Sequence, residues 1–443
     1  MNIRGNWTSI ILLTLDVGGL YLIIILSQAA RLNEWGRDIN FSLAMVLFVT
    51  LMVFYVFNLY SLDRMSRSLE TLMRTSLAVG VASLITAAMI YTTRSFDVDP
   101  VLWRSVFLVS MFSYLFWAAL IRFLIIRWVR INRRPRWLVV AKKATFDVLY
   151  QEMASVDPAI LLHDLKGDHP DQIFLQATEL DKQYGLDGVI VDQENYLNKE
   201  LIPKLMHLRF SGCRVLGTEE FFEEFAMKIP VAYLKDHWFV ISEGFTLLHH
   251  SAQLRVKRLF DLLIAGLGLI VLVPAVLLCA PLIKLDGGRV FYRQQRTGKD
   301  GIPFFLVKLR TMREDAEQGK AQWAEKNDPR TTTVGRWLRR TRLDELPQLW
   351  NVIKGDMSFV GPRPERPDFN LILEKEIPYY NLRHMVKPGI TGWAQVMYPY
   401  GASVSDALRK LEYDLYYIKN YSLILDLYIA LRTIKVVVSH AGR

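Results

Sequence analysis

Cysteine is scarce in this sequence. Neither sign of charge is missing, since 54 Lys and Arg residues face 44 Asp and Glu residues. Two cysteines, Cys213 and Cys279, occur among 443 residues, which excludes a disulfide framework and a cysteine-based zinc site. We interpret both as reduced core residues of a chain whose soluble parts face a reducing compartment. Hydrophobic residues make up 51% and charged residues 22% of the chain. This mixture excludes a disordered chain and argues against a protein made only of membrane spans, so the average combines stretches suited to lipid with stretches suited to water.

Four apolar runs in the first third of the chain predict membrane-spanning helices. They cover residues 7–30, 39–62, 77–91 and 106–126, and the third is short unless it begins near Leu72. A run of about 20 apolar residues is long enough to cross a bilayer, and the short connections predict an antiparallel four-helix bundle. Arginines are enriched in the flanks that share a side with the N-terminus, so both ends of the bundle are predicted to be cytoplasmic. Asp16, inside the first run, is interpreted as a polar contact between helices, with a proton relay as the alternative.

Residues 136–250 have the texture of a soluble α/β domain. Short apolar strands are predicted at 137–140, 188–191 and 213–216, and helices at 146–154, 201–210 and 221–225. Strands that alternate with helices predict a small parallel, doubly wound, Rossmann-like sheet. The first turn, Ala141 to Thr145, lacks the glycines that let a backbone approach a pyrophosphate. We therefore expect a structural or regulatory module rather than a dinucleotide site.

A fifth apolar run, residues 262–283, is interrupted by Pro274. A proline in mid-helix removes a backbone hydrogen bond and kinks the helix. Basic residues flank both ends of the run, so we predict a re-entrant membrane helix over about 258–285 that enters and leaves on the cytoplasmic face, with its kink at Pro274. A fifth span with a simple proline kink is the alternative. The basic stretch that follows suits anionic lipid headgroups or phosphorylated substrates, and nucleic acid is disfavoured because the stretch directly follows a membrane segment.

An acidic pair, Asp344 and Glu345, lies in a field of arginines just before Pro347. Because proline is tolerated in the first turn of a helix, the pair is predicted to lie near a helix N-terminus. A carboxylate in such a field stays ionised and can hold Mg²⁺ or attack an electrophilic phosphorus. Plain helix capping is the alternative for such a pair. The surrounding arginines are Arg336, Arg339, Arg340, Arg342, Arg363 and Arg366.

Several long motifs occur in a fixed order in the second half of the chain. They are KRLFD at 257–261, KLRTM at 308–312, RRTRLDELPQLWNVIKGDMSFVGPRPE at 339–365, KPGITGWAQV at 387–396 and KLEYDLYYIKNYSLILDL at 410–427. In this order they closely resemble the bacterial monotopic phosphoglycosyl transferases, over residues of about 255–438. The four spans and the degenerate nucleotide fold upstream resemble the large form of this family, which includes the polyprenyl glycosylphosphotransferases that initiate exopolysaccharide and O-antigen assembly.

The resemblance implies a two-step transfer of a sugar 1-phosphate from a UDP-sugar, a UDP-hexose, to undecaprenyl phosphate, with release of UMP. Carried onto this chain, it implies that Asp344 is the nucleophile of a covalent phosphosugar intermediate and that Glu345 assists in acid/base or metal chemistry. Asp344 and Glu345 would hold Mg²⁺, which neutralises phosphate charge. The substrate and phosphate contacts expected with this site are Lys308, Arg310, Arg342, Arg363 and Arg383.

The predicted domain organisation is a four-helix transmembrane domain at 1–135, a cytoplasmic degenerate nucleotide-fold domain at 136–250 and a catalytic domain at 251–443. We expect an enzyme of the bacterial inner membrane with its catalytic domain on the cytoplasmic face, acting in the first membrane step of polysaccharide assembly. The expected partners are the UDP-sugar, undecaprenyl phosphate, membrane lipids, a second copy in a homodimer, and downstream glycosyltransferases. A non-catalytic membrane scaffold or regulator is the alternative, and a conventional glycosyltransferase would differ by releasing UDP.

Overall fold

A computed structural model describes most of the chain in two compact units, residues 1–215 and 216–443. The described residues are 3–32, 41–60, 68–93, 104–132, 134–164, 170–192, 196, 199–245, 251–286, 288–313, 328–398, 401 and 403–438.

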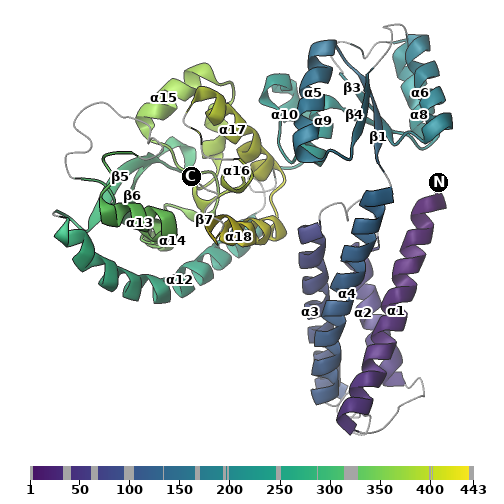
Figure 1. The fold of residues 1–443 in the computed structure, drawn as a ribbon, viewed down its shortest axis with the longest axis horizontal. Helices are drawn as coiled ribbons and strands as arrows, with labels where there is room; N and C mark the ends of the chain where they lie inside the picture. The colour runs from purple at the N-terminus through teal and green to yellow at the C-terminus, as the bar shows by residue number, and fades with distance from the viewer. Residues whose placement is uncertain are drawn as a thin grey trace. The chain divides into compact units, whose positions relative to one another are not determined.

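The N-terminal part of the first unit is a bundle of four helices (Figure 1). They are α1 (Ile3–Leu32), α2 (Phe41–Val56), α3 (Ser68–Thr93) and α4 (Arg104–Asn132). Within the described residues, the stretches Ser9–Arg31, Thr71–Met89 and Ser105–Trp128 are long and apolar enough to cross a membrane, whereas Leu43–Val56 is a shorter apolar helix. The third run, which looks short in the sequence, gains its length because α3 already begins at Ser68. Four predicted apolar helices are thus confirmed, and three of them have the length of a span.

A buried ion pair joins the first and last helices of this bundle. Arg122 of α4 donates from Nη1 and Nη2 to the two carboxylate oxygens of Asp16 on α1, at 3.1 and 2.9 Å. Both side chains are fully buried, and the guanidinium lies 4.8 Å from the centre of the Phe54 ring on α2. The interpretation of Asp16 as a polar contact between helices is confirmed.

The rest of the first unit is built around a four-stranded sheet with the strand order β2-β1-β3-β4. Strand β1 pairs in parallel with β2 and with β3, so that Leu138 faces His163 on one side and Val189 on the other. Figure 1 shows α6 and α8 on one face of the sheet and α5 on the other. The elements are β1 (Arg136–Val140), α5 (Lys143–Val156), β2 (Leu161–Asp164), α6 (Pro170–Tyr184), β3 (Gly188–Val191), α8 (Leu201–Phe210) and β4 (Arg214–Gly217).

The sequence predicts the central strands of this sheet but misses β2 and α6. Strand β2 is a partly buried edge strand of four residues that ends in His163 and Asp164, so it lacks a continuous apolar run. Helix α6 buries only Pro170, Ile173 and Ala177 along 15 residues. The predicted parallel α/β sheet is confirmed, and its kinship with nucleotide-binding folds stays a prediction.

The second unit combines two small sheets with helices. Strands β5 and β6 form an antiparallel hairpin, and the short strands β7 and β8 pair in parallel. The elements from residue 251 onward are α12 (Ser251–Leu285), β5 (Phe291–Thr297), η5 (Lys299–Gly301), β6 (Pro303–Leu309), α13 (Thr333–Thr341), η6 (Leu343–Glu345), α14 (Gln348–Lys354), β7 (Ser358–Val360), α15 (Pro367–Glu376), η7 (Tyr380–Met385), β8 (Gly389–Thr391), α16 (Trp393–Met397), α17 (Val404–Lys419) and α18 (Leu423–Val438).

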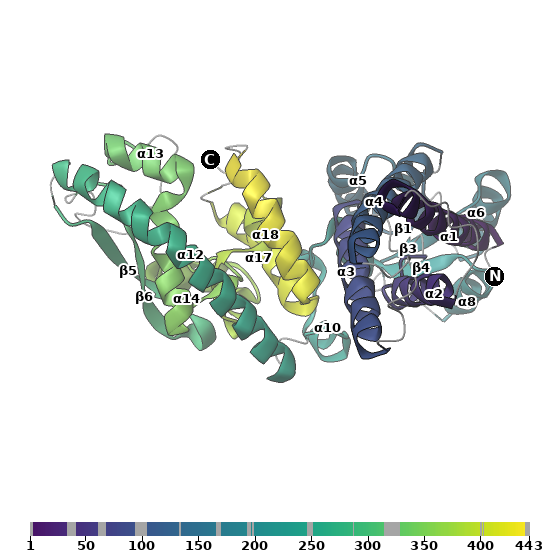
Figure 2. The same ribbon diagram turned by 90° about the horizontal axis from the view of Figure 1, so that it is seen from below.

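Helix α12 is the fifth apolar run, and it bends by 49° between Ile270 and Leu272. Pro274 accounts for this position, because its ring clashes with the carbonyl of the residue four before it, Ile270. Both halves pack against the same unit: Ala265 belongs to a core cluster with Leu306, Leu349, Val352 and Met357, whereas Cys279 and Ile283 belong to one with Leu309 and Leu338. Figure 2 shows α12 running beside α13, α14 and α18.

The KRLFD motif fastens the start of α12 by its charged side chains. Lys257 Nζ donates to Asp426 Oδ2 at 2.7 Å and to the Val360 carbonyl at 3.0 Å. Arg258 donates to the Ile353 carbonyl at 2.7 Å, and Asp261 Oδ1 accepts from the Phe359 amide at 2.8 Å. The motif therefore ties α12 to α18, α14 and β7 at once.

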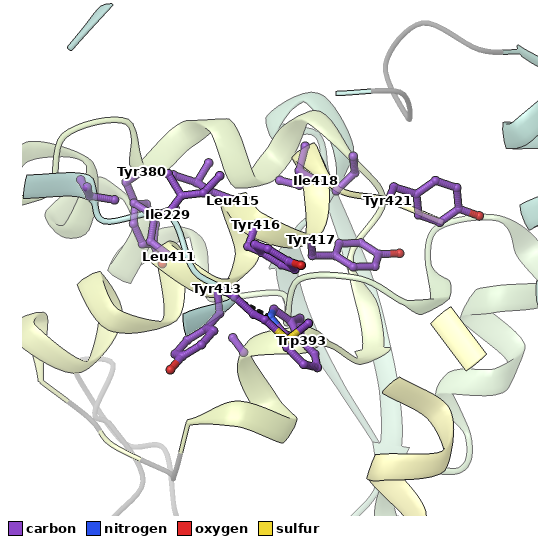
Figure 3. Close-up of a cluster of buried hydrophobic side chains, with 14 of the residues drawn as sticks. Ile229, Tyr380, Trp393, Leu411, Tyr413, Leu415, Tyr416, Tyr417, Ile418 and Tyr421 are labelled. Atoms are coloured by element: carbon purple, nitrogen blue, oxygen red, sulfur yellow. Dashed lines mark hydrogen bonds between the residues drawn. The ribbon is translucent and has the colours of Figure 1, made fainter. Parts of the chain in front are cut away.

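A segment upstream of α12 completes the core of the second unit. It contains α9 (Thr218–Phe221), η3 (Phe222–Ala226), η4 (Val231–Tyr233) and α10 (Asp236–Ile241). Trp393 donates from Nε1 to the Met227 carbonyl at 2.9 Å. Figure 3 shows Ile229 in the buried cluster around Trp393, Leu411 and Tyr416. By its contacts this segment belongs with the second unit, whereas the sequence groups it with the upstream sheet. The predicted boundary between the nucleotide-fold domain and the catalytic domain at residue 250 stays a prediction in terms of function.

The Asp16–Arg122 pair generates a stability prediction. Removing one partner of a buried ion pair leaves an uncompensated charge, at a cost of about 3–5 kcal/mol. Asp16→Asn or Arg122→Met alone should therefore lower the melting temperature of the protein in detergent micelles. The double variant Asp16→Leu/Arg122→Met should recover most of the loss, because neither charge is then buried alone. Thr14→Val, on the exposed face of α1, serves as the control, and single variants that melt like the wild type would contradict the prediction.

Candidate active site

The acidic pair lies in a tight turn between two helices. Helix α13 ends at Thr341, and the next residue, Arg342, has a left-handed φ of 60°. The 3₁₀ turn η6 then carries Asp344 and Glu345 up to Pro347, the residue before α14. A left-handed conformation is uncommon for a residue other than glycine, and it reverses the chain sharply here. Leu343 and Leu346 pack into the core clusters on either side of the turn. The backbone of the pair is thereby held in place, and Asp344 is buried.

Glu345 is held by two arginines. Its Oε1 accepts from Arg363 Nη2 at 2.7 Å and from Arg342 Nη1 at 3.3 Å. Burial alone would raise the pKa of this carboxyl, but the charges of Arg363 and Arg342 outweigh it and lower the pKa to about 2. A carboxylate with so low a pKa is a weak base. The geometry therefore favours an electrostatic or metal-binding role for Glu345 over proton transfer.

Lys308 joins this group from strand β6. It stands opposite Tyr292 of β5, with Nζ 5.0 Å from the ring centre. Burial and the charge of nearby Arg296 lower the pKa of Lys308 to about 8, although Asp344 and Glu345 oppose the shift. The ammonium group is therefore close enough to interact electrostatically with both carboxylates. A lysine with a pKa near the working pH in a charged cluster is typical of a functional site.

Arg363 lies on the GPRP loop, residues 361–364. Carbonyl groups of this loop accept hydrogen bonds from neighbouring elements. Pro362 and Pro364 have no N–H to donate, so the loop is held largely through its carbonyl oxygens, while the Gly361 amide donates to the Thr391 carbonyl at 2.9 Å. The carbonyl of Pro362 accepts from the Gly389 amide at 2.9 Å, and that of Pro364 from Arg296 Nη1 at 3.2 Å. A Cβ at Gly389 would lie 2.1 Å from the nitrogen of Gly361, so only glycine allows the two backbones to approach this closely.

The structure thus brings together most of the residues that the sequence predicts, and it places two of them elsewhere. Asp344, Glu345, Lys308, Arg342 and Arg363 form one charged cluster. Arg310 is buried, and its Nη2 donates to the Ile283 carbonyl at the end of α12, at 2.8 Å. Arg383 is also buried, and its Nη2 donates to the carbonyl of Arg363 at 3.0 Å. Phosphate contacts by Arg310 and Arg383 stay predictions.

Two further arginines border the site and are missing from the predicted set of contacts. Arg296 on β5 lies near Lys308 and Arg363 in the electrostatic field of the site. Arg339 on α13 donates from Nε to Thr311 at 2.9 Å and from Nη1 to Thr331 at 3.1 Å. The alternation along β5, in which Tyr292, Gln294 and Arg296 share the less exposed face, is the sequence signal that could have found Arg296.

The donor set of the site fits a Mg²⁺ ion that arrives with a substrate. Among the described residues, no group of three or more His, Cys, Asp or Glu side chains could hold a metal by itself. Mg²⁺ is commonly bound by one or two carboxylates, with substrate phosphates and water completing its shell. Asp344 and Glu345 are adjacent carboxylates of this kind. The predicted magnesium stays a prediction.

Comparison with known protein families places this cluster in a described family. The sequence model of the bacterial sugar transferases matches residues 252–440. A Bacillus subtilis protein with the provisional name undecaprenyl-phosphate N-acetylgalactosaminyl 1-phosphate transferase is 50% identical over 142 residues, which cover 32% of this chain and 79% of that protein. The chain belongs to the bacterial sugar transferase family. All five residues of the charged cluster lie within the matched range.

Two larger relatives of this sugar transferase extend the comparison. A UDP-N-acetylgalactosamine-undecaprenyl-phosphate N-acetylgalactosaminephosphotransferase of Aeromonas hydrophila is 46% identical over 188 residues, which cover 42% of this chain and 44% of the relative. A UDP-glucose:undecaprenyl-phosphate glucose-1-phosphate transferase of Xanthomonas campestris pv. campestris is 35% identical over 290 residues, or 62% of this chain and 55% of the relative. The chain thus spans about half the length of these two relatives, and its similarity to the second one reaches upstream of residue 252.

The lowered pKa of Lys308 predicts how anion binding depends on pH. As the pH rises through about 8, Lys308 loses its proton, and the site loses one positive charge. The affinity for inorganic pyrophosphate, measured by calorimetry, should then fall by about tenfold relative to Lys308→Arg, because arginine stays charged throughout. The Lys308→Arg control also corrects for the titration of pyrophosphate itself. An affinity ratio between the two proteins that stays constant from pH 6.5 to 9.5 would refute this assignment.

Proposed function

We propose that this sugar transferase moves a sugar 1-phosphate from a UDP-sugar to undecaprenyl phosphate and releases UMP. The observation that carries the proposal is the acidic pair Asp344–Glu345, held among Lys308, Arg342 and Arg363. A nucleophilic carboxylate among cations suits an electrophilic phosphorus, because phosphoryl transfer mainly requires positioning and charge stabilisation. The names of the relatives, which specify sugar-phosphate transfer to undecaprenyl phosphate, support the same reaction.

In the first step, a carboxylate oxygen of Asp344 attacks the β-phosphorus of the UDP-sugar. The bond from that phosphorus to the bridging oxygen breaks, and UMP leaves with the oxygen and its electron pair. In the second step, a phosphate oxygen of undecaprenyl phosphate attacks the same phosphorus, and the bond to Asp344 breaks to restore the carboxylate. A covalent carrier suits a donor from water and an acceptor from lipid, because the two need not be bound together.

The arginines around Glu345 would be ready for phosphate before the substrate binds. Glu345 holds the fork of Arg363 at 2.7 Å, and a phosphate oxygen could take over one of the N–H groups without rebuilding the site. Lys308 and Arg342 would share the negative charge that develops on the phosphoryl oxygens. Mg²⁺, held by Asp344 and Glu345, would supply further charge neutralisation when bound. These preorganised charges are the main catalytic contribution that we assign to the protein.

The form of α12 supports a catalytic unit seated in one leaflet. Its start is tied to the unit through Lys257 and its end through Arg310, so both ends return to the same body. Its outer face exposes large apolar side chains, which favour lipid, and Trp337 and Trp350 of the neighbouring helices are exposed as well. The exposed apolar residues of α12 include Leu259, Leu263, Leu267, Ile270, Val273, Leu277, Leu278, Leu282 and Leu285. We therefore propose that α12 is a re-entrant helix and that Pro274 makes its kink.

The proposed reaction also bears on the location, the partners and the sugar substrate of the protein. We place the protein in the bacterial inner membrane with its catalytic unit on the cytoplasmic side, as the arginine distribution suggests. The Rossmann-like module would have a structural or regulatory role. The protein would form a homodimer and would act with downstream glycosyltransferases in assembling a polysaccharide. The sugar is a hexose or an N-acetylhexosamine, since the relatives named above include both classes.

The reaction is tested by screening a panel of UDP-sugars with Mg²⁺ and undecaprenyl phosphate. The wild-type protein should release UMP, and label from the β-phosphate should remain on the protein when the acceptor is left out. Asp344→Asn should lower UMP release by at least about a thousandfold, because removal of a nucleophile abolishes the covalent path. Asp300→Asn, an exposed carboxylate in the β5–β6 turn, should change neither result. Release of UDP, or a fully active Asp344→Asn variant, would exclude the proposed mechanism.

The re-entrant helix is tested by cysteine labelling in intact and permeabilised spheroplasts. After Cys213 and Cys279 are replaced by alanine, single cysteines at Ser251 and Gln294 should react with an impermeant maleimide only after permeabilisation. Both positions would then lie on the cytoplasmic side. Labelling of Gln294→Cys in intact spheroplasts would mean that α12 spans the membrane.

A further inference from the structure

A buried ion pair stands behind the GPRP loop. Arg383 of η7 and Asp414 of α17 approach to 2.8 Å, and the two side chains are almost completely buried. The same guanidinium donates from Nη1 to the Tyr380 hydroxyl at 2.6 Å and from Nη2 to the Arg363 carbonyl at 3.0 Å. One side chain thus links η7, α17 and the loop that carries Arg363.

The bond to the Arg363 carbonyl has a direct effect on the Arg363 side chain. Because Pro364 follows, the backbone of Arg363 is restricted to extended conformations. The carbonyl carbon and Cβ are attached to the same Cα, so a fixed carbonyl also fixes the direction in which the side chain starts. Arg383 therefore controls where the Arg363 guanidinium can reach. Its own N–H groups donate to Tyr380 and to this carbonyl, and Nη2 also lies 2.8 Å from Asp414 Oδ2.

Asp414 in turn keeps the Arg383 fork oriented. Burial raises the pKa of Asp414 to about 6, although the charges of Arg383 and Lys410 oppose the shift. The carboxylate is therefore ionised at neutral pH, and the pair is intact there. A buried guanidinium without its carboxylate would be costly and would turn toward other acceptors.

We propose that Arg383 and Asp414 are positioning residues that hold the Arg363 carbonyl and so aim the Arg363 guanidinium at the phosphate-binding site. The inference deepens the proposed function, since it assumes that Arg363 binds a phosphate. It differs from the motif-based expectation for Arg383, because Arg383 acts through Arg363 instead of touching phosphate.

Helix α17 also offers a matched control. Glu412 is nearly as buried as Asp414, and its Oε2 lies 3.3 Å from Lys228 Nζ. Its other ion-pair partner is Arg409, also at 3.3 Å, and neither of these bonds reaches the GPRP loop. Glu412→Gln therefore removes a buried carboxylate of the same helix without loosening Arg363.

The test is a double-mutant cycle on the full-length protein, with the affinity for inorganic pyrophosphate as the readout. Asp414→Asn should weaken binding by about tenfold, and Arg363→Gln by at least as much. The double variant should bind no more weakly than Arg363→Gln alone, because Asp414 acts only through Arg363. Glu412→Gln should leave the affinity unchanged in both backgrounds. Thermal unfolding confirms that each variant is folded at the temperature of the measurement.

Additive losses in the double variant would overturn the proposal, as would an equal loss in Glu412→Gln or a wild-type protein that does not bind pyrophosphate. If Asp414→Asn fails to fold, Tyr380→Phe takes its place, because it removes only the hydroxyl that accepts from Arg383. It should weaken binding by about threefold, and only when Arg363 is present. An unchanged affinity in this variant would also overturn the proposal.

UMP release by the same preparations separates the two proposals. A cycle that behaves as expected in a protein that releases no UMP from any UDP-sugar would refute the transferase reaction and leave the positioning role intact. UMP release together with an additive cycle would refute the positioning role alone.

Discussion

The backbone of residues 360–365 is the constraint on which the second unit depends. Its carbonyl groups accept hydrogen bonds from α12 through Lys257, from η7 through Arg383 and from β5 through Arg296. Two prolines in this stretch remove N–H groups, so side chains and strands from elsewhere fix it mainly through its oxygens. The apolar helix α12 and a strand that borders the acidic pair are therefore fastened to the same short stretch of backbone. The position of Arg363 is the joint product of these elements.

Electrostatics then explains why the acidic pair tolerates burial. Glu345 is stabilised as an anion by Arg363 and Arg342, and those arginines are stabilised as cations by Glu345. Burial and the charges of Arg296 and Arg339 leave the pKa of Lys308 near 8. The site therefore holds a carboxylate paired with two arginines beside a buried lysine whose charged form is disfavoured. An incoming phosphate dianion would satisfy Lys308 and could share the arginine forks, so binding relieves a cost that folding has left in place.

The sequence predicts the residues of the charged cluster better than it predicts the elements and contacts that hold them in place. Motif order identified the positions of Asp344, Glu345, Lys308 and Arg363, and the structure brings them together. Apolar runs predicted the bundle helices and the central strands, but β2 and α6 carry too few buried residues to stand out. Arg383 could not be understood from spacing, because its partner Asp414 lies on a helix 31 positions further along the chain (414 − 383). A basic residue near a phosphate motif looks the same whether it points at the ligand or at the backbone behind it.

The order in which the chain is synthesised gives the upstream segment of the second unit a further consequence. Glu223 accepts a hydrogen bond from Lys419, 196 positions later in the chain. The carbonyl of Met227 accepts from Trp393, which is also synthesised much later. Between Met227 and Trp393 the ribosome delivers α12, an apolar helix that emerges before its partners α13, α14 and α18 exist. Since distant contacts form slowly and late, the core closes only when α17 and α18 emerge. If α12 enters the membrane as proposed, it does so before the active site can assemble.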